Sequence, residues 1–409
     1  MSSAYDTLKE RGFIAQTTND ETLRQLLDGG KPARFYVGFD PTADSLHIGH
    51  FIPIMAMAHL QRAGHLPIAL IGAGTTMVGD PSGRTDMRKM MSAEQINDNA
   101  DRFKEQLSRF LDFSEGRAIM VNNADWLLEL NYVEFLRDIG VHFSVNRMLT
   151  ADCYKARLEK GLSFIEFNYM LMQSYDFLEL FRRYGCALQL GGDDQWSNII
   201  SGADLVRRKE GKEAVGLTLS LLTTTEGVKM GKTERGALWI DGTKTPPFEF
   251  YQYFRNVRDE DVISCLYLLT FIPVAEINEY KDAGCRDINR IKKILAYETT
   301  KIVHGETEAD NCAALAESLF GSGGGADHLA PAFVSPEQAA EGVGVVDLLI
   351  LCGLSPSRSD ARRLIAQGGI IAGGVKAPSV DHKIFTKDFS EGELLLQKGK
   401  KSFGRIKIS

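Results

Sequence analysis

The sequence predicts an α/β protein with a parallel sheet, because two buried strands are separated by a helix long enough to serve as a crossover. The first strand is the aromatic run at residues 35–39, and the second is the apolar run at 67–72, about thirty residues further on. Between them, apolar side chains recur at helical spacing from Ile48 to Met57, and Ser45 is expected to cap this helix.

The remaining segments continue the alternation of helices and strands. The expected elements are an amphipathic helix up to about residue 31, helices near 94–111 and 131–140, a strand at 117–121, a more helical region at 125–185, and a strand at 188–192. Residues 246–320 are expected to be helical, and the Gly-rich run at 321–326 has the composition of a flexible linker. Two short helices at 345–354 and 357–365 and a hairpin at 368–376 follow.

Bulk composition indicates a globular protein of two or three domains, since 409 residues exceed one ordinary core. No apolar run is long enough for a membrane span, and the N-terminus lacks the basic and apolar regions of a signal peptide. The six cysteines form no C-x-x-C pair, which fits reduced thiols. We therefore expect a cytoplasmic protein with no membrane partner.

Charge is distributed unevenly along the chain. From Glu341 onward, eleven basic residues face seven acidic ones, a net charge of +4, while the rest of the chain carries −11. Such an asymmetry favours a polyanion bound at the C-terminal end.

The turn after the first strand contains His47-Ile48-Gly49-His50. A helix that begins directly after a parallel strand points free N–H groups at the crevice and favours an anion there. His47 and His50 are three apart, so both can face that crevice, and Gly49 leaves room for a flat group against the backbone. Two ordinary polar residues at a helix start are the simpler interpretation. A zinc site is disfavoured, because no Cys or third His lies at ligand spacing.

Two other nucleotide-binding motifs fail on the sequence itself. The dinucleotide motif G-x-G-x-x-G has its first two glycines at Gly72 and Gly74, but Met77 occupies the third position. The P-loop motif requires a glycine five positions before Gly231, where this chain has Glu226.

Three further groups of polar residues follow predicted elements. Tyr169, Gln173 and Asp176 form a polar stripe on an otherwise apolar helix, which indicates a ligand more than solvent. Gly191-Gly192 permits close approach of a purine or ribose, and the carboxylates that follow suit ribose hydroxyls or, more simply, a helix cap. Two lysines, Lys229 and Lys232, flank a glycine and suit a phosphate clamp.

Four of these motifs, in this order, resemble those of class I aminoacyl-tRNA synthetases, and of the bacterial tyrosyl-tRNA synthetases in particular. They are the string from Tyr36 to His50, the stripe from Tyr169 to Asp176, the run Leu188 to Asn198, and Gly227 to Thr233, which is similar to the family's K-M-S-K-S signature. The resemblance extends over nearly the whole chain. It implies a Rossmann-like catalytic domain at 1–222 with a helical dimerisation insertion at about 125–185. A signature loop and an α-helical anticodon-side domain at 223–320, a flexible linker at 321–340 and a small α+β S4-like RNA-binding domain at 341–409 would follow.

The resemblance also implies a reaction and its partners. Tyrosine and ATP, with Mg²⁺, would give tyrosyl-adenylate and pyrophosphate, and the tyrosyl group would then pass to tRNA(Tyr) on a homodimeric enzyme. No protein-bound metal is implied. Tyrosine would be bound by Tyr36, Asp80, Tyr169, Gln173, Asp176 and Gln195, and ATP by Gly38, Asp40, His47, His50, Gly192, Asp194, Lys229, Lys232 and Thr233. Catalysis would rest on Thr42, His47, His50, Lys229, Lys232, Arg84 and Arg88, and RNA contacts on Arg358, Arg362 and Arg363.

The sequence departs from the family pattern at three positions. Asp193 stands where relatives commonly have Ser, Ser197 where they have Gly, and Arg84 where they often have Lys. Two alternatives remain. A tryptophanyl-tRNA synthetase is disfavoured because Tyr36 and Asp176 suit a phenol. A non-catalytic RNA-binding protein is disfavoured because the His and Lys pairs are intact.

Overall fold

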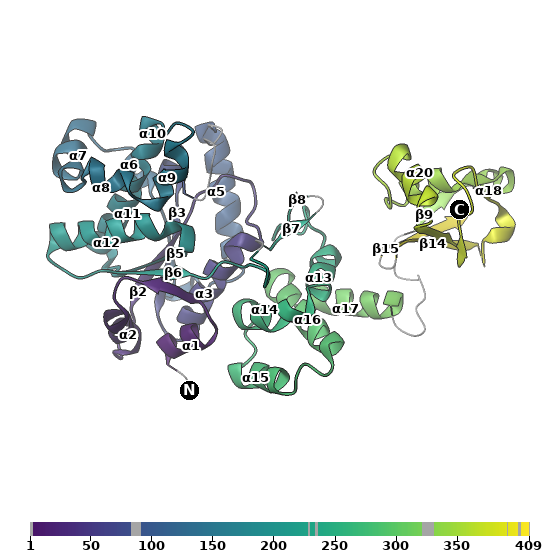
Figure 1. Ribbon diagram of the computed structural model, residues 1–409, viewed down its shortest axis with the longest axis horizontal. Helices are drawn as coiled ribbons and strands as arrows, with labels where there is room; N and C mark the ends of the chain where they lie inside the picture. Colours follow the sequence, from purple (N-terminus) through teal and green to yellow (C-terminus); the bar gives the residue numbers. More distant parts are fainter. Residues whose placement is uncertain are drawn as a thin grey trace. The chain divides into compact units, whose positions relative to one another are not determined.

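The computed structural model describes residues 3–82, 91–227, 230–233, 236–320, 331–390, 392–399 and 402–408. They form two compact units, Met1–Asp310 (unit 1) and Asn311–Ser409 (unit 2). Figure 1 shows that unit 1 is built around one twisted sheet flanked by helices, whereas unit 2 has its own sheet. The predicted linker run at 321–326 lies outside the described residues.

Six strands form the sheet of unit 1, in the order β1-β6-β5-β2-β3-β4. They are β1 Ile14–Thr17, β2 Arg34–Phe39, β3 Leu66–Ile71, β4 Ile119–Asn122, β5 Leu188–Gly192 and β6 Val215–Leu219. Only β1 is antiparallel to its neighbour; the other pairs are parallel. The predicted α/β class and the predicted strands at 35–39, 67–72, 117–121 and 188–192 are therefore confirmed.

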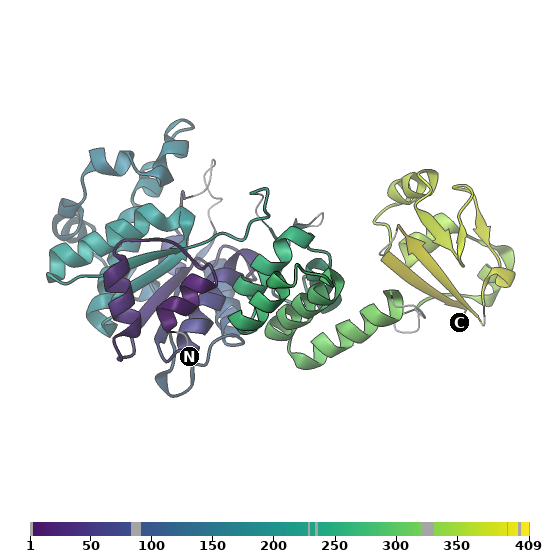
Figure 2. The same ribbon diagram turned by 60° about the horizontal axis from the view of Figure 1, so that its bottom comes forward.

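Helices cover both faces of this sheet (Figures 1 and 2). Helix α3 (Phe51–Arg62) packs on one face, and α11 (Tyr169–Tyr184) and α12 (Trp196–Glu210) on the other. Successive side chains of a strand point to opposite faces. Accordingly Tyr36 contacts Phe177 of α11, with ring centroids 5.3 Å apart, whereas Phe39 faces His50.

The other helices of unit 1 fall into two groups. The first group belongs to the sheet region and its insertion: α1 Ala4–Glu10, α2 Asp20–Asp28, α4 Ala73–Thr76, α5 Ala93–Leu107, α6 Ala124–Leu127, α7 Tyr132–Asp138, α8 Val145–Leu149, α9 Asp152–Leu158 and α10 Phe164–Phe167. The second group, here called the helical part, contains α13 Pro247–Arg255, α14 Val262–Leu269, α15 Val274–Asp282, α16 Ile288–His304 and the start of α17 Glu306–Phe320. The short hairpin of β7 (Lys232–Thr233) and β8 (Gly236–Ala237) precedes it.

Three local expectations were wrong. The N-terminal stretch is two helices separated by β1, because Gly12, at a φ of +77°, ends the first helical segment before the chain pairs with β6. Ser45 caps no helix; its hydroxyl donates to the Leu46 carbonyl, and His47 is the N-cap instead. The predicted helix through Phe164 breaks at Asn168 into α10 and α11.

Arg11 joins the sheet region to the helical part within unit 1. Its buried guanidinium donates to the carbonyls of Tyr267, Thr270 and Ile272, at and beyond the C-terminal end of α14. These carbonyls would otherwise lack intrahelical donors. In the helical region between β4 and β5, Arg157 and Glu166 form a buried ion pair. Two N–H···O bonds join the two side chains.

Unit 2 is a small α+β body. Its main sheet has the order β12-β11-β14-β15-β9, and a short pair, β10 and β13, stands beside it. The bounds are β9 Ala332–Val334, β10 Val343–Gly344, β11 Ile370–Ala372, β12 Val375–Lys376, β13 Lys383–Ile384, β14 Glu393–Lys398 and β15 Ser402–Ile408, with helices α18 Pro336–Glu341, α19 Val345–Leu351 and α20 Arg358–Ala366. The two predicted helices and the hairpin of β11 and β12 are confirmed.

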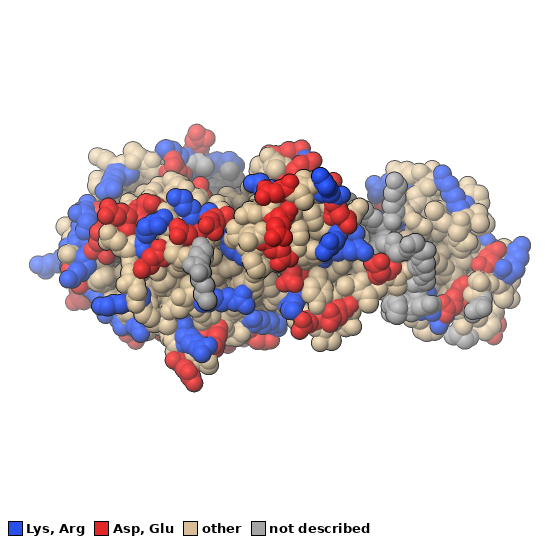
Figure 3. Space-filling view, turned by 90° about the horizontal axis from the view of Figure 1, so that it is seen from below, with Lys and Arg blue, Asp and Glu red and all other residues tan. Residues whose placement is uncertain are grey.

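Three general properties of the described chain are its surface charge, its cysteines and the polarity of its helices. Figure 3 shows Lys and Arg side chains interspersed with Asp and Glu on one face of unit 1. The six cysteines form no disulfide. Within the described ranges, every helix is too short or too polar to cross a membrane.

Candidate active site

A cavity of about 480 Å³ opens at the carboxyl ends of the central strands. The chain runs outward from β2 through β3 and β4 and then returns to place β5 on the other side of β2, so strand order reverses between β2 and β5. Open α/β sheets bind ligands at such a reversal. Thirteen predicted residues line this cavity: Tyr36, Gly38, Asp40, Thr42, His47, His50, Asp80, Tyr169, Gln173, Asp176, Gly192, Asp194 and Gln195.

At one end of the cavity lie the phenol of Tyr36, on β2, and the carboxyl group of Asp176, on α11. Tyr36 on β2 is 1% exposed, and its hydroxyl has no hydrogen-bond partner among the described residues. Asp176 on α11 is also buried and accepts hydrogen bonds from Asn123 Nδ2 at 2.9 Å and Trp126 Nε1 at 2.8 Å. An unpaired buried hydroxyl is costly, so this end suits a ligand that carries a polar group.

Burial dominates the electrostatics of these two side chains. It raises the pKa of Asp176 to about 8, although the hydrogen bonds from Asn123 and Trp126 favour the ionised form. It also raises the pKa of the Tyr36 phenol well above its ordinary value, and the nearby Asp176 carboxylate adds to this shift. The Tyr36 hydroxyl therefore remains protonated at neutral pH and can donate a hydrogen bond.

Sequence reasoning missed Asn123, Trp126 and Thr75, which organise this end. Asn123 follows β4, accepts the Gly74 N–H at Oδ1 and donates to Thr75 Oγ1 and to Asp176. The sequence did hold one signal. An asparagine directly after a strand predicted to be parallel lies at the ligand-binding edge of the sheet.

A second group of acceptors lies in the middle of the cavity. The Tyr169 hydroxyl donates to Asp40 Oδ2 at 2.9 Å, and Gln195 Nε2 donates to Asp80 Oδ2 at 2.7 Å. The Oε1 atom of Gln173 is buried without a partner among the described residues. This concentration of acceptors suits a bound ammonium group.

The histidine turn forms the far end. His47 Nδ1 accepts the Gly49 N–H at 3.0 Å, and His50 Nδ1 accepts the His47 N–H at 3.1 Å. The two rings are 4.1 Å apart by centroid, and burial lowers the pKa of His47. Gly49 leaves room for a flat group against the backbone, as expected, and the His47 imidazole lies there: a Cβ on Gly49 would be 2.7 Å from its Cε1.

The turn after β5 separates two adjacent carboxylates. Asp194 lines the cavity, as predicted. Asp193 instead accepts hydrogen bonds from Gln16 Nε2 at 2.6 Å and Thr218 Oγ1 at 2.9 Å, on β1 and β6. The Asp193 carboxylate therefore binds donors on β1 and β6 at the edge of the sheet, and these two hydrogen bonds stabilise its negative charge.

Several predicted cations lie outside what the structure describes. Arg84, Arg88 and Lys229 are not among the described residues, and Lys232 and Thr233 are described only as the backbone of β7. Among the described lining residues, four are carboxylates (Asp40, Asp80, Asp176 and Asp194) and none is Lys or Arg. Within the same described ranges, no cluster of His, Cys, Asp and Glu has the arrangement of a metal site.

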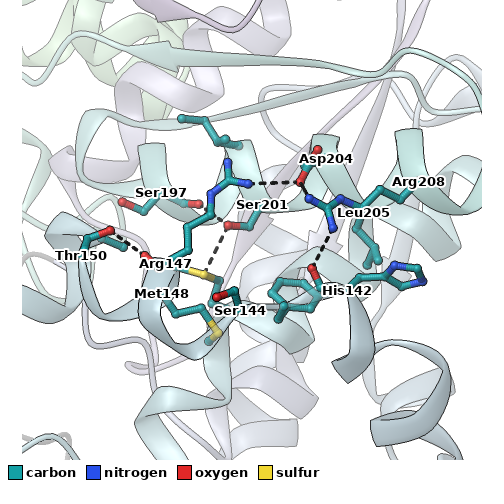
Figure 4. Close-up of a pocket in the computed structure, with 14 residues that line it drawn as sticks. His142, Ser144, Arg147, Met148, Thr150, Ser197, Ser201, Asp204, Leu205 and Arg208 are labelled. Carbon is teal, nitrogen blue, oxygen red and sulfur yellow. Dashed lines mark hydrogen bonds and ion pairs between the residues drawn. The ribbon is translucent and has the colours of Figure 1, made fainter.

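A smaller cavity of about 180 Å³ lies between the insertion and α12. Figure 4 shows Arg147 and Arg208 directed towards Asp204, at 3.5 Å and 2.9 Å, while Arg208 also donates to the His142 carbonyl. None of the predicted site residues lines this cavity.

The predicted RNA-contacting arginines lie on α20 of unit 2. All three are exposed. Arg358 pairs with Asp347 and Arg363 with Asp360, each at 2.5 Å. Arg362 has no acidic partner within the described part of unit 2.

The raised pKa of Asp176 predicts a pH-dependent stability. Between about pH 4 and pH 8 the folded chain retains a proton that the unfolded chain has released, so the free energy of unfolding should fall as pH rises from 5 to 8. Replacing Asp176 by Asn removes this titration. Urea unfolding of both proteins across this range should show a fall that is smaller by about 2 kcal/mol or more in Asp176→Asn. Parallel curves for the two proteins would contradict the assignment.

Comparisons with known proteins identify the family of the chain. The family described as tRNA synthetases class I (W and Y) matches residues 28–321, and the Tyrosine–tRNA ligase SYY-like C-terminal domain matches 330–406. The chain is 61% identical to a tyrosine–tRNA ligase of Acetivibrio thermocellus over 408 residues and 57% identical to one of Clostridium botulinum over 410, each covering 100% of both chains.

A solved structure gives the same result. A C-terminally truncated mitochondrial tyrosyl-tRNA synthetase of Aspergillus nidulans matches with a TM-score of 0.70 and 31% identity, over 78% of this chain and 95% of that one. The comparisons favour neither the tryptophan alternative nor a non-catalytic RNA-binding protein. The chain belongs to the class I aminoacyl-tRNA synthetases and, within them, to the tyrosine–tRNA ligases.

Proposed function

We propose that the cavity at the carboxyl ends of β2 and β5 holds tyrosine and ATP end to end while the ligase forms tyrosyl-adenylate, and that the tyrosyl group then passes to tRNA(Tyr). The observation that carries this assignment is the buried hydroxyl of Tyr36, which has no partner among the described residues and lies near the Asp176 carboxyl group. A substrate phenol satisfies both groups at once, because it accepts from Tyr36 and donates to Asp176.

Specificity follows from the same pair. Phenylalanine would fill the space but leave the Tyr36 hydroxyl without a partner among the described residues, and Asp176 would keep only its bonds from Asn123 and Trp126. An unpaired buried hydroxyl is costly. Asn123 and Trp126 hold Asp176 from the other side, so its carboxylate cannot turn away to find solvent.

The tyrosine ammonium group is assigned to the acceptors in the middle of the cavity. Asp80, Tyr169 and Gln173 surround it, and Gln195 lies towards the substrate carboxylate. This orientation directs the carboxylate at the histidine turn. The reacting group is already a nucleophile, so catalysis consists mainly of positioning and charge stabilisation.

ATP is assigned to the nucleotide side, which Gly38, Asp40, Gly192 and Asp194 line. Thr42 and His47 would contact the γ-phosphate and His50 the adenylate phosphate. Charge that develops on the leaving pyrophosphate would be stabilised by Arg84, Arg88, Lys229 and Lys232, with Thr233 beside them. Mg²⁺ would enter with ATP and reduce phosphate repulsion from the cavity's carboxylates, since it is bound chiefly by phosphates and water.

Transfer of the tyrosyl group requires tRNA. Unit 2 is assigned to it on the net charge of +4 from Glu341 onward and on the exposed arginines of α20, of which Arg362 is the least constrained by an acidic partner. The division of the chain at 222, 320 and 340 stays a prediction, as does its cytoplasmic location.

A homodimer is proposed on the apolar surface of the insertion. Tyr132, Val133, Val141, Val145 and Phe164 are each more than half exposed, although they lie within one short stretch of the chain. Large exposed apolar patches mark interfaces, and a symmetric dimer would cover this one on both copies.

The first test is tyrosine-dependent exchange of pyrophosphate into ATP, without tRNA. Exchange with tyrosine, and none with phenylalanine or tryptophan, is expected. Tyr36→Phe should lower kcat/KM for tyrosine about tenfold, because one buried hydrogen bond to the phenol is lost. Exchange supported equally well by phenylalanine would overturn the phenol assignment.

The proposed role of the histidine turn predicts that a substitution there changes the rate of adenylate formation but not the binding of tyrosine. His47→Ala should slow adenylate formation about a hundredfold while the Kd for tyrosine stays nearly unchanged, because the lost contact is made to phosphate in the transition state. Single-turnover kinetics and equilibrium dialysis measure the two quantities. A large loss of tyrosine binding is the outcome that rules out this role.

The proposed dimer interface predicts that a charge introduced on it prevents dimerisation, whereas a charge introduced elsewhere does not. Val141 is 72% exposed on the insertion, and Val375 is 70% exposed in unit 2. Sedimentation velocity should give a monomer for Val141→Lys and a dimer for the unsubstituted chain and for Val375→Lys. A monomeric unsubstituted chain would exclude the proposal.

A further inference from the structure

Two residues of the helical part hold the chain segment that leads into the nucleotide side of the cavity. The Gly231 N–H donates to the Tyr253 hydroxyl on α13 at 2.7 Å. Six residues earlier, the Thr225 N–H donates to Asp261 Oδ1, just before α14, also at 2.7 Å. The helical part therefore holds the backbone of this segment at two points, Thr225 and Gly231.

Gly231 also packs against the histidine turn. Gly231 has a φ of +88°, and a Cβ built on it would lie 1.7 Å from Ile48 Cγ2. The Gly231 carbonyl accepts the Leu238 N–H at 2.8 Å, and the Leu238 carbonyl accepts the Ile48 N–H at 2.9 Å. Gly231 and Met230 themselves line the cavity. A chain of backbone contacts thus runs from Tyr253 to the residue that follows His47.

One of the two groups that hold the segment, Asp261, is buried. Asp261 is 3% exposed, and its Oδ2 atom has no hydrogen-bond partner among the described residues. A buried carboxylate with an unused oxygen costs stability. Such a cost is easier to understand at a functional position than in a purely structural one.

We infer that Tyr253 and Asp261 are positioning residues for adenylate formation, which hold the backbone at Gly231 and Thr225 so that Gly231 and His47 keep their places beside the ATP phosphates. The inference rests on the proposed function, because it concerns the step in which ATP reacts. Neither residue lines the cavity, so each acts through the backbone that it holds.

Tyr253→Phe and Asp261→Leu test this directly, since each removes the side-chain acceptor with little change of size. The single-turnover rate of adenylate formation should fall about tenfold in each variant, as one hydrogen bond that holds the transition-state geometry is lost. The Kd for tyrosine should change less than twofold. Transfer of tyrosine from preformed adenylate to tRNA should proceed at the rate of the unsubstituted chain.

Tyr297→Phe is the matched control. It removes a hydroxyl that donates to Asp310 at 2.8 Å, also in the helical part but far along the chain from residues 225–231. Its adenylate rate should equal that of the unsubstituted chain. If either test variant folds poorly, the other still tests the inference, because the two hold opposite ends of the segment.

The possible failures are distinguishable. Normal adenylate rates in both variants, or a slowing that affects transfer to tRNA equally, would overturn the positioning role and leave the proposed function intact. Absence of tyrosine-dependent exchange in the unsubstituted chain would instead overturn the proposed function.

Discussion

The parallel pairing of β2 with β5 is the constraint on which the site depends. This pairing places Tyr36 beside Gln189, and the chain returns to it only after β3 and β4 have been built on the other side. The reversal leaves no crossover helix over the gap between the two strand ends. Residues from three strand ends and from α11 consequently meet around one space, and no single segment of the chain could supply them.

Several buried polar atoms that line the cavity have no hydrogen-bond partner among the described residues. The Tyr36 hydroxyl, Gln173 Oε1 and Gln189 Oε1 are all buried without a partner among the described residues, although each could have been an apolar atom at lower cost. The surrounding core is apolar and tightly packed around Phe177 and Leu178. The protein thus concentrates its unfavourable groups where a tyrosine substrate would relieve them.

Sequence reasoning found the residues that line the cavity better than the residues that hold them in place. The strands and the stripe from Tyr169 to Asp176 follow from periodicity, which local sequence records. Asn123 and Trp126 lie 53 and 50 residues before Asp176, so their contact depends on packing that no local pattern encodes. Asp193 and Asp194 show the same limit, because adjacent carboxylates point to different neighbours only once β1 pairs with β6.

Charge explains why the two substrates make different demands on the protein. The carboxylates of Asp40, Asp80 and Asp194, which line the described cavity, favour an ammonium group and oppose a triphosphate. The amino acid can therefore bind to groups that the fold already holds in place. ATP needs compensating cations, and the sequence offers Arg84, Arg88, Lys229 and Lys232 for this role. On this basis, the contact that Tyr253 makes with Gly231 is expected to affect adenylate formation more than tyrosine binding.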